Sequence, residues 1–160
     1  YFTDNDQADN TFTAGSVKIQ LIEEQSNADH TGFVPYDGEK VLMPIVGSAQ
    51  GEKYPNGQPK AENYIDKVVT IQNTGNTAAD AAAAIVITDT FDPRLTDLTV
   101  TLNGTALTAP TQYTYDAATG VFATVAGVVT VPAATFTQDA ATGAYSTTPG
   151  TAVLTVTGTV

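Results

Sequence analysis

The fold is decided by the stretch Lys67-Val-Val-Thr-Ile-Gln-Asn-Thr-Gly-Asn-Thr-Ala-Ala-Asp80 and by the apolar run that follows it to Thr88. From Val68 to Asn73, successive side chains form two alternating sets, the period of a β-strand. The segment Asn73-Thr-Gly-Asn76 is typical of a turn, because glycine accepts positive φ and asparagine bonds its own backbone. The residues from Ala81 to Thr88 then predict a return strand, so we expect 67–88 to form a hairpin at the centre of a sheet.

The composition favours an all-β domain. The 160-residue chain is 42% hydrophobic, and it is rich in Thr and Val but contains neither Trp nor Cys. Branched side chains suit strands, and a chain of this length forms one domain with a sizeable core. We therefore expect residues 1–160 to fold as a single domain. The absence of cysteine excludes disulfides, a thiol nucleophile and a cysteine-based zinc site.

The charge excludes several classes of partner. The formal net charge is −11, and all six basic residues precede Leu98. Nucleic acid and anionic membrane surfaces bind clustered Lys and Arg, so neither is an expected partner. No apolar run reaches the roughly 18–20 residues of a membrane span, so we expect no transmembrane segment in this chain. Because the sequence begins at Tyr1 without Met, we expect a preceding segment to have been removed.

The first half of the chain contains one clear strand and one long irregular stretch. Residues Ser16 to Ile22 alternate cleanly, with Val17, Ile19 and Leu21 on one side. The stretch 23–63 is rich in proline and glycine and is long for a connection in a compact domain. Two interpretations remain open: an ordered excursion with one or two short strands, or a flexible insertion.

The second half contains repeated hairpin signals. Asn103-Gly104 lies between two apolar pieces, which strongly predicts a tight hairpin. The sequence of 115–124 recurs in similar form at 138–147, and each copy places Asp at the start of a turn and Gly at its left-handed position. A final strand is predicted from Ala152 to Val160. About eight to ten strands separated by turns predict a jelly-roll-like antiparallel β-sandwich.

No catalytic constellation is evident in the sequence. The single histidine, His30, lies in an irregular polar stretch, which argues against paired-histidine zinc chemistry and against a Ser-His-Asp triad. Most acidic residues lie in Gly- and Asn-containing turns, where aspartate bonds the backbone. We therefore expect no catalytic residues and no cofactor, and a metal-dependent hydrolase is the least favoured function.

Two weaker chemical signals deserve mention. Asp4, Asp6 and Asp9 alternate like the first ligands of a calcium loop, but the glycine and terminal glutamate of an EF-hand are missing, so Ca²⁺ is only a weak candidate. A Lys–Asn isopeptide bond could use Lys18 or Lys67, but the last strand contains no asparagine, so the sequence disfavours it.

Two segments carry a resemblance to a known family. Tyr1-Phe-Thr-Asp4 and then Asn10-Thr-Phe-Thr-Ala-Gly-Ser-Val-Lys-Ile-Gln-Leu21 resemble the mature start of the TasA/camelysin family, and the piece around Asn73-Thr-Gly-Asn-Thr-Ala78 resembles its second motif. The latter is also similar to repeats of bacterial surface adhesins. The resemblance covers about the first 22 residues well and 65–92 moderately, and it is absent from 23–63.

The resemblance implies a secreted jelly-roll protein with a SipW-type signal peptide that assembles into extracellular biofilm matrix fibres. In that family a subunit's N-terminal segment adds as a strand to its neighbour. The exchangeable segment here would be 1–12, with Tyr1, Phe2 and Phe12 as anchors. No ligand set supports the protease activity associated with the camelysin name. The leading hypothesis is a non-enzymatic structural protein of a Gram-positive-type cell surface or matrix, associating with itself or with other matrix proteins. The alternative is an adhesion or ligand-binding module that uses 23–63.

Overall fold

Antiparallel strands make up nearly all the regular structure in the computed structural model, which describes residues 15–26, 32–35, 64–91 and 94–159. The strands are β1 (Ile19–Ser26), β2 (Phe33–Pro35), β3 (Tyr64–Asn73), β4 (Thr88–Thr90), β5 (Thr96–Leu102), β6 (Thr105–Ala106), β7 (Tyr113–Asp116), β8 (Val121–Thr124), β9 (Thr135–Gln138), β10 (Tyr145–Thr148) and β11 (Gly150–Thr159). The predicted all-β, sandwich-like class is confirmed.

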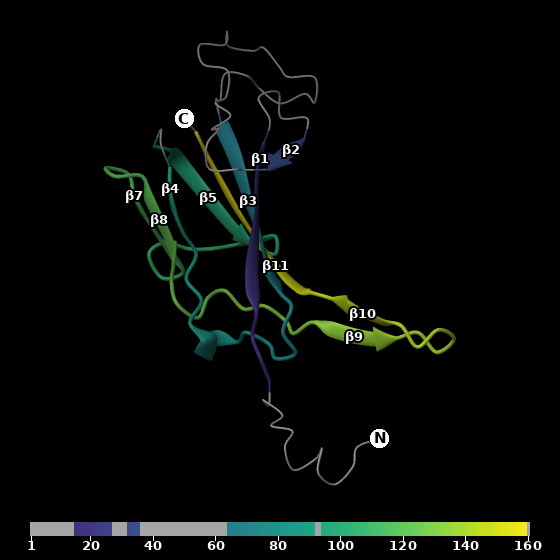
Figure 1. Ribbon diagram of the computed structural model, residues 1–160. Coiled ribbons are helices and arrows are strands. Elements are labelled where there is room, and N and C mark those ends of the chain that lie inside the picture. The colour runs from purple at the N-terminus through teal and green to yellow at the C-terminus, as the bar shows by residue number, and fades with distance from the viewer. Residues whose placement is uncertain (1–14, 27–31, 36–63, 92–93, 160) are drawn as a thin grey trace.

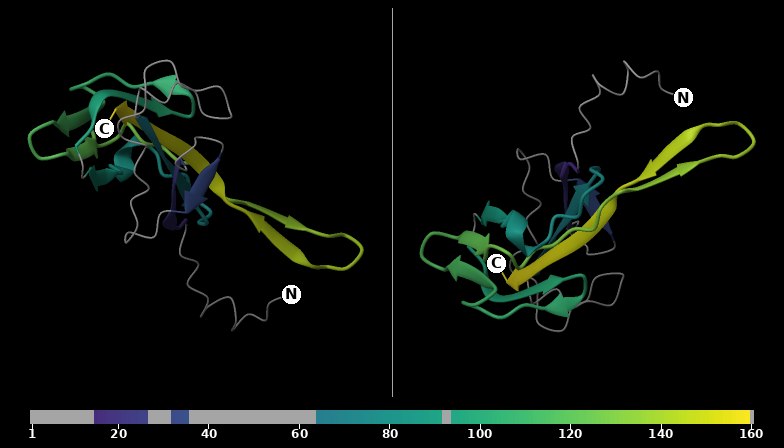
Figure 2. Two further views of the ribbon diagram at one scale, coloured as in Figure 1. Left: turned by 90° about the horizontal axis from the view of Figure 1, so that it is seen from above. Right: turned by 90° about the horizontal axis from the view of Figure 1, so that it is seen from below.

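The strands form one large sheet, one small sheet and a separate hairpin. The large sheet has six strands in the order β2-β1-β3-β11-β5-β6, and the small sheet has three in the order β4-β8-β7. Strands β9 and β10 pair only with each other, and this hairpin projects away from the other strands (Figures 1 and 2). Strand β11, which was predicted at the end of the chain, lies in the middle of the large sheet, hydrogen-bonded to β3 on one side and to β5 on the other.

The core lies between the large and the small sheet. Directly opposed residues of an antiparallel pair share a face, so the register places Ile71 beside Ala152 and Val69 beside Leu154 on the inner face of the large sheet. From the small sheet, Phe122 of β8 packs against this face, and its side chain is buried. The remaining buried members of the core come from β5, β11 and the connections, namely Ala79, Ile87, Val100, Val129, Val131 and Val156.

The predicted hairpin over 67–88 is wrong. Strand β3 pairs with β1 and β11, and the residues after it leave the large sheet. Asp80 accepts a hydrogen bond from Ala82 N, which starts a short 3-10 turn, η2 (Ala81–Ala83), and Ala84 ends it in the left-handed region. The chain then enters β4 in the small sheet. The side chains of Ala81 to Ala84 are too small to give a strand a well-packed apolar face, whereas a capped turn needs no buried side chains. The strand over 68–73, the turn at Asn73 and the central position of β3 are as expected, whereas the return strand does not pair with β3.

The turn after β3 also fixes the start of β1. The amide oxygen of Asn73 accepts hydrogen bonds from Lys18 N at 3.1 Å and from Gly75 N at 3.0 Å, and its Nδ2 donates to Thr77 O at 2.8 Å. A Cβ on Gly75 would lie 1.9 Å from the carbonyl oxygen of Ser16. Glycine is therefore required here by the close approach of two backbones, not by the turn alone.

The three short hairpins predicted in the second half are confirmed. Asn103 and Gly104 both have positive φ and join β5 to β6. In the two related copies, Gly120 and Gly143 take the left-handed conformation. Their amides donate to the carbonyl oxygens of Asp116 at 2.7 Å and Asp139 at 2.8 Å respectively.

The irregular stretch 23–63 begins later than expected. Its first four residues extend β1 to Ser26, and Phe33–Pro35 forms β2 against the end of β1. For the described part, this agrees with an ordered excursion that includes a short strand. Residues 27–31 and 36–63 lie outside the described ranges. The strand predicted at 16–22 is present, but its regular pairing with β3 runs from Ile19 to Gln25.

Candidate functional site at an open sheet edge

Among the described strands, none pairs with the outer edge of β1 along most of its length. Strand β2 pairs with β1 only from Glu24 to Ser26, whereas β3 pairs with the other side of β1 from Ile19 to Gln25. Within the described ranges, the segment 19–23 therefore has a strand neighbour on one side only. Such an edge is a template for pairing with another chain.

The register shows which backbone groups point out from this edge. The carbonyl oxygen of Lys18 accepts a hydrogen bond from Thr74 N at 2.9 Å, so Lys18 faces β3. Alternate residues of an antiparallel strand bond the same neighbour. Gln20 and Ile22 therefore also face β3, and the N–H and C=O groups of Ile19 and Leu21 point to the open side.

The same two residues carry exposed apolar side chains. Ile19 lies opposite Asn73 and Leu21 opposite Ile71, so both belong to the inner face of the large sheet. Asn73 and Ile71 are fully buried, yet Ile19 is 39% and Leu21 45% exposed. Val17, which precedes them with the same alternation, is 42% exposed. The inner apolar face of the sheet thus continues beyond the part that is covered.

The position of the small sheet explains this exposure. Strands β7 and β8 lie on the side of the molecule away from β1 (Figures 1 and 2). Three short strands of three or four residues cover less area than a six-stranded sheet. Ile19 and Leu21 at the start of β1 are consequently left at the margin of the core. We refer to Val17, Ile19, Leu21 and the outward backbone groups of 19–23 as the β1 edge.

The opposite edge of the large sheet is built differently. There β6 covers the end of β5, and the uncovered part of β5 carries mainly Thr and Asp. The pairing of β5 with β11 is interrupted between Thr157 and Thr159, and Asp97 has a φ of 52°. Bulges and charged residues discourage pairing with another chain. Unlike this edge, the β1 edge combines outward backbone groups that have no described strand partner with exposed apolar side chains.

The anchors and ligands predicted from the sequence cannot be placed. Tyr1, Phe2 and Phe12, the calcium candidates Asp4, Asp6 and Asp9, and His30 all lie outside the described residues. Among the residues that are described, no group of three or more His, Cys, Asp or Glu side chains is arranged to hold a metal ion. In the same part of the chain, no helix has the length and apolar character needed to cross a membrane.

No family model matches this sequence, and neither the curated proteins nor the solved structures contain a significant match to it.

The alternation of Val17, Ile19 and Leu21 is visible in the sequence, but the exposure of these side chains is not. An apolar alternation predicts one buried face. Whether that face is covered depends on the width of the facing sheet, which is assembled from β4, β7 and β8 far along the chain. The one available signal was the shortness of the apolar segments after Thr88.

Proposed function

We propose that this chain is a secreted structural protein that assembles into fibres of a bacterial matrix or cell surface by β-strand addition at the β1 edge. The observation that carries the proposal is that, on one strand, outward backbone groups without a described strand partner coincide with exposed apolar side chains at Ile19 and Leu21. Strand addition uses both features, because backbone hydrogen bonds supply affinity and alternate side chains fill pockets.

The added strand is provided by the N-terminal segment 1–12 of a neighbouring copy. This segment contains Tyr1, Phe2 and Phe12, whose rings would cover the apolar side chains of the β1 edge. Donor and acceptor are different surfaces of the same chain, so each subunit can accept one strand and donate another. A head-to-tail contact of this kind produces open filaments where its rotation does not close a ring.

The proposal places the protein outside the cell of a Gram-positive-type bacterium. Its support is the resemblance of 1–22 to secreted matrix proteins and a cysteine-free, strongly acidic sequence that keeps single subunits soluble. No observation on the described residues favours the adhesion or ligand-binding alternative, whose expected site at 23–63 is described only at 23–26 and 32–35.

The test is fibre formation by the purified chain, followed by light scattering and electron microscopy. Leu21→Lys places a charge where the added strand would lie, and an uncompensated charge at an interface costs enough to lower assembly at least ~10-fold. Deletion of 1–12 removes the donor and is expected to abolish fibres while leaving the fold intact.

Two matched variants serve as controls. Gln20→Lys introduces the same charge on the opposite face of β1, and Phe136→Lys removes an exposed apolar side chain on the projecting hairpin. Both are expected to assemble like the parent chain. Unchanged fibres from Leu21→Lys would exclude the β1 edge as acceptor, and unchanged fibres from the deletion variant would exclude 1–12 as donor.

A further inference from the structure

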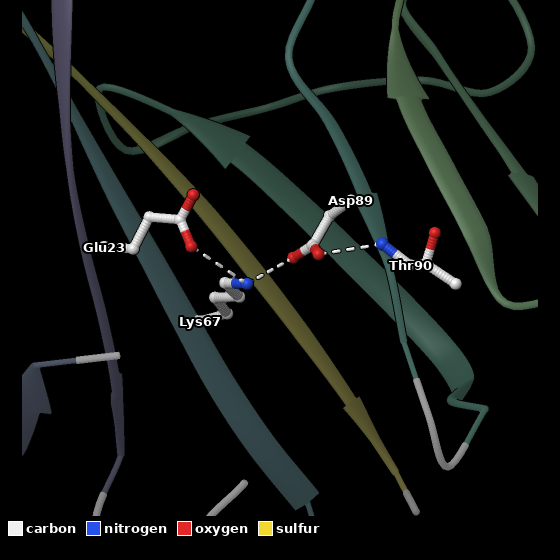
Figure 3. A network of polar contacts seen from close by, with 4 residues as sticks. All are labelled: Glu23, Lys67, Asp89 and Thr90. Atoms are coloured by element: carbon white, nitrogen blue, oxygen red, sulfur yellow. Dashed lines mark hydrogen bonds and ion pairs between the residues drawn. The ribbon is translucent and has the colours of Figure 1, made fainter. Parts of the chain in front are cut away.

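A lysine lies in the core between two carboxylates. The side chain of Lys67 on β3 is only 7% exposed, and its Nζ lies 3.3 Å from Glu23 Oε2 and 2.5 Å from Asp89 Oδ2 (Figure 3). The ring of Phe91 lies on the same amine, with its centroid 5.9 Å from Nζ. Burying a lysine in this way is costly unless it is well paired, and nothing in the β1 edge uses it.

The register of both sheets directs these groups toward one another. Lys67 is opposite Val156 on the inner face of the large sheet, in line with Val69 and Ile71. Asp89 is opposite Phe122 in the small sheet, so it shares the inner face that Phe122 presents to the core. The amine and the carboxylate therefore come from the two facing layers, and Glu23 reaches the amine from β1, next to β3.

The carboxylate of Asp89 is held in a defined orientation. Its Oδ1 accepts a hydrogen bond from the backbone amide of Thr90 at 2.8 Å, whereas Oδ2 contacts Nζ. A donor on Oδ1 stabilises negative charge that would develop on that oxygen during attack at the carboxyl carbon. Holding an amine against an acyl group in a fixed geometry corresponds to a very high effective concentration. The Lys67 side chain is buried, whereas the side chains of Asp89 and Glu23 are 24% and 35% exposed.

We propose that Lys67 and Asp89 form an intramolecular isopeptide bond, with Glu23 as the group that transfers the protons. The bond would join β3 to β4 and thus the two layers of the fold. It does not depend on fibre assembly, so it can hold or fail independently of the proposed function.

The reaction is a condensation that needs no co-reactant. Glu23 takes one proton from the Lys67 ammonium, and the neutral amine attacks the carboxyl carbon of Asp89. The tetrahedral intermediate expels the Oδ2 oxygen, which leaves as water with the proton held by Glu23 and a second proton from the nitrogen. One N–C bond forms, one C–O bond breaks, and Glu23 returns to its starting state. An ammonium and a carboxylate have become an amide and one water molecule.

The sequence disfavoured a cross-link because it offered no asparagine on the last strand. The structure instead brings an aspartate from β4 to Lys67, and these two residues are 22 positions apart in the chain. No spacing rule identifies that pairing, because it depends on how the small sheet packs against the large one.

Intact mass spectrometry of the purified full chain tests the proposal. The parent chain is expected to weigh less than its sequence mass by one water molecule. Trypsin should then fail to cleave after Lys67 and release 61–94 as one fragment with that deficit. Further cleavage before Asp80 should leave two peptides that remain joined. A folded parent chain at its full sequence mass, after prolonged incubation, would overturn the proposal and leave a buried ion pair.

Three variants assign the roles, with circular dichroism as the check that each remains folded. Lys67→Arg and Asp89→Ala are expected at full sequence mass, and a persisting water loss in either would place the dehydration elsewhere and overturn the assignment. Glu23→Gln keeps the shape but not the base, so bond formation is expected to slow by about 100-fold or more. An unchanged rate in this variant would exclude Glu23 as the proton carrier.

Discussion

Asn73 shows how one side chain can connect two distant parts of the chain. Its identity predicts a turn, and Gly75 N does donate to its side chain. The same oxygen also accepts from Lys18 N, and Nδ2 donates to Thr77 O, so the residue fixes the start of β1 as well as the turn. A sequence reveals the local half of this role, because the Asn-x-Gly spacing is short-range. It does not reveal the half that depends on pairing with β1.

Asn73→Ala is therefore expected to destabilise the fold by about 3 kcal/mol, since each of three hydrogen bonds contributes about 1 kcal/mol. Urea unfolding followed by circular dichroism measures the loss. The matched control is Asn76→Ala, because Asn76 is exposed and its Oδ1 accepts one backbone bond, from Ser16 N at 2.7 Å. Equal losses in the two variants would contradict the role assigned to Asn73.

At the scale of elements, the sequence predicted hairpins that depend on a local turn, but it did not predict which distant strands pair with each other. The hairpins at Asn103-Gly104, 115–124 and 138–147 were predictable because each turn dictates which strands it joins. The hairpin at 67–88 was wrong because Asp80 starts a capped 3-10 turn and sends the chain to the other layer. The candidate site was half predictable for the same reason: the apolar alternation of β1 is local, whereas its exposure depends on the small sheet.

The β9–β10 hairpin predicts a pH effect confined to one turn. Hydrogen bonds from the backbone and hydroxyl of Thr142, and from the backbone of Ala141, lower the pKa of Asp139 below its ordinary value. These hydrogen bonds favour the charged carboxylate, so their contribution to the stability of the fold is fully present above the pKa that Asp139 has in the unfolded chain. It is lost as the pH falls through the lower pKa of the folded hairpin.

Carboxyl NMR titration measures this effect directly. Thr142→Val removes the hydroxyl but keeps the amide, so the pKa of Asp139 is expected to rise toward its ordinary value. Asp116 occupies the equivalent turn of the other hairpin, where its pKa is likewise lowered, first by the backbone of Ala118. It provides an internal reference that should not move. A pKa of Asp139 that is unaffected by the substitution would contradict the assigned cause.

For the whole molecule, the unequal size of the two layers links stability to assembly. The small sheet leaves an apolar margin uncovered at Ile19 and Leu21 of β1, and its own Phe122 is buried against the large sheet. The proposed Lys67–Asp89 bond would join these two layers covalently, whereas the β1 edge would join one molecule to the next. Assembly and the joining of the layers thus involve different residues: Ile19 and Leu21 of β1 in the first case, Lys67 of β3 and Asp89 of β4 in the second.

Phe122→Ala tests whether the two layers form one cooperative unit. Phe122 is 1% exposed and lies 5.7 Å from Tyr113 and 6.5 Å from Phe91 between ring centroids. Its truncation is expected to cost about 3–5 kcal/mol, whereas Phe136→Ala, on the exposed hairpin, should change stability by about 0.5 kcal/mol or less. Urea transitions followed by the NMR ring signals of Tyr113 and Tyr115, which lie in the small sheet, and by far-ultraviolet circular dichroism should coincide in both variants. Separate transitions would mean that the small sheet unfolds by itself, and the core between the layers would then not be what holds this fold together.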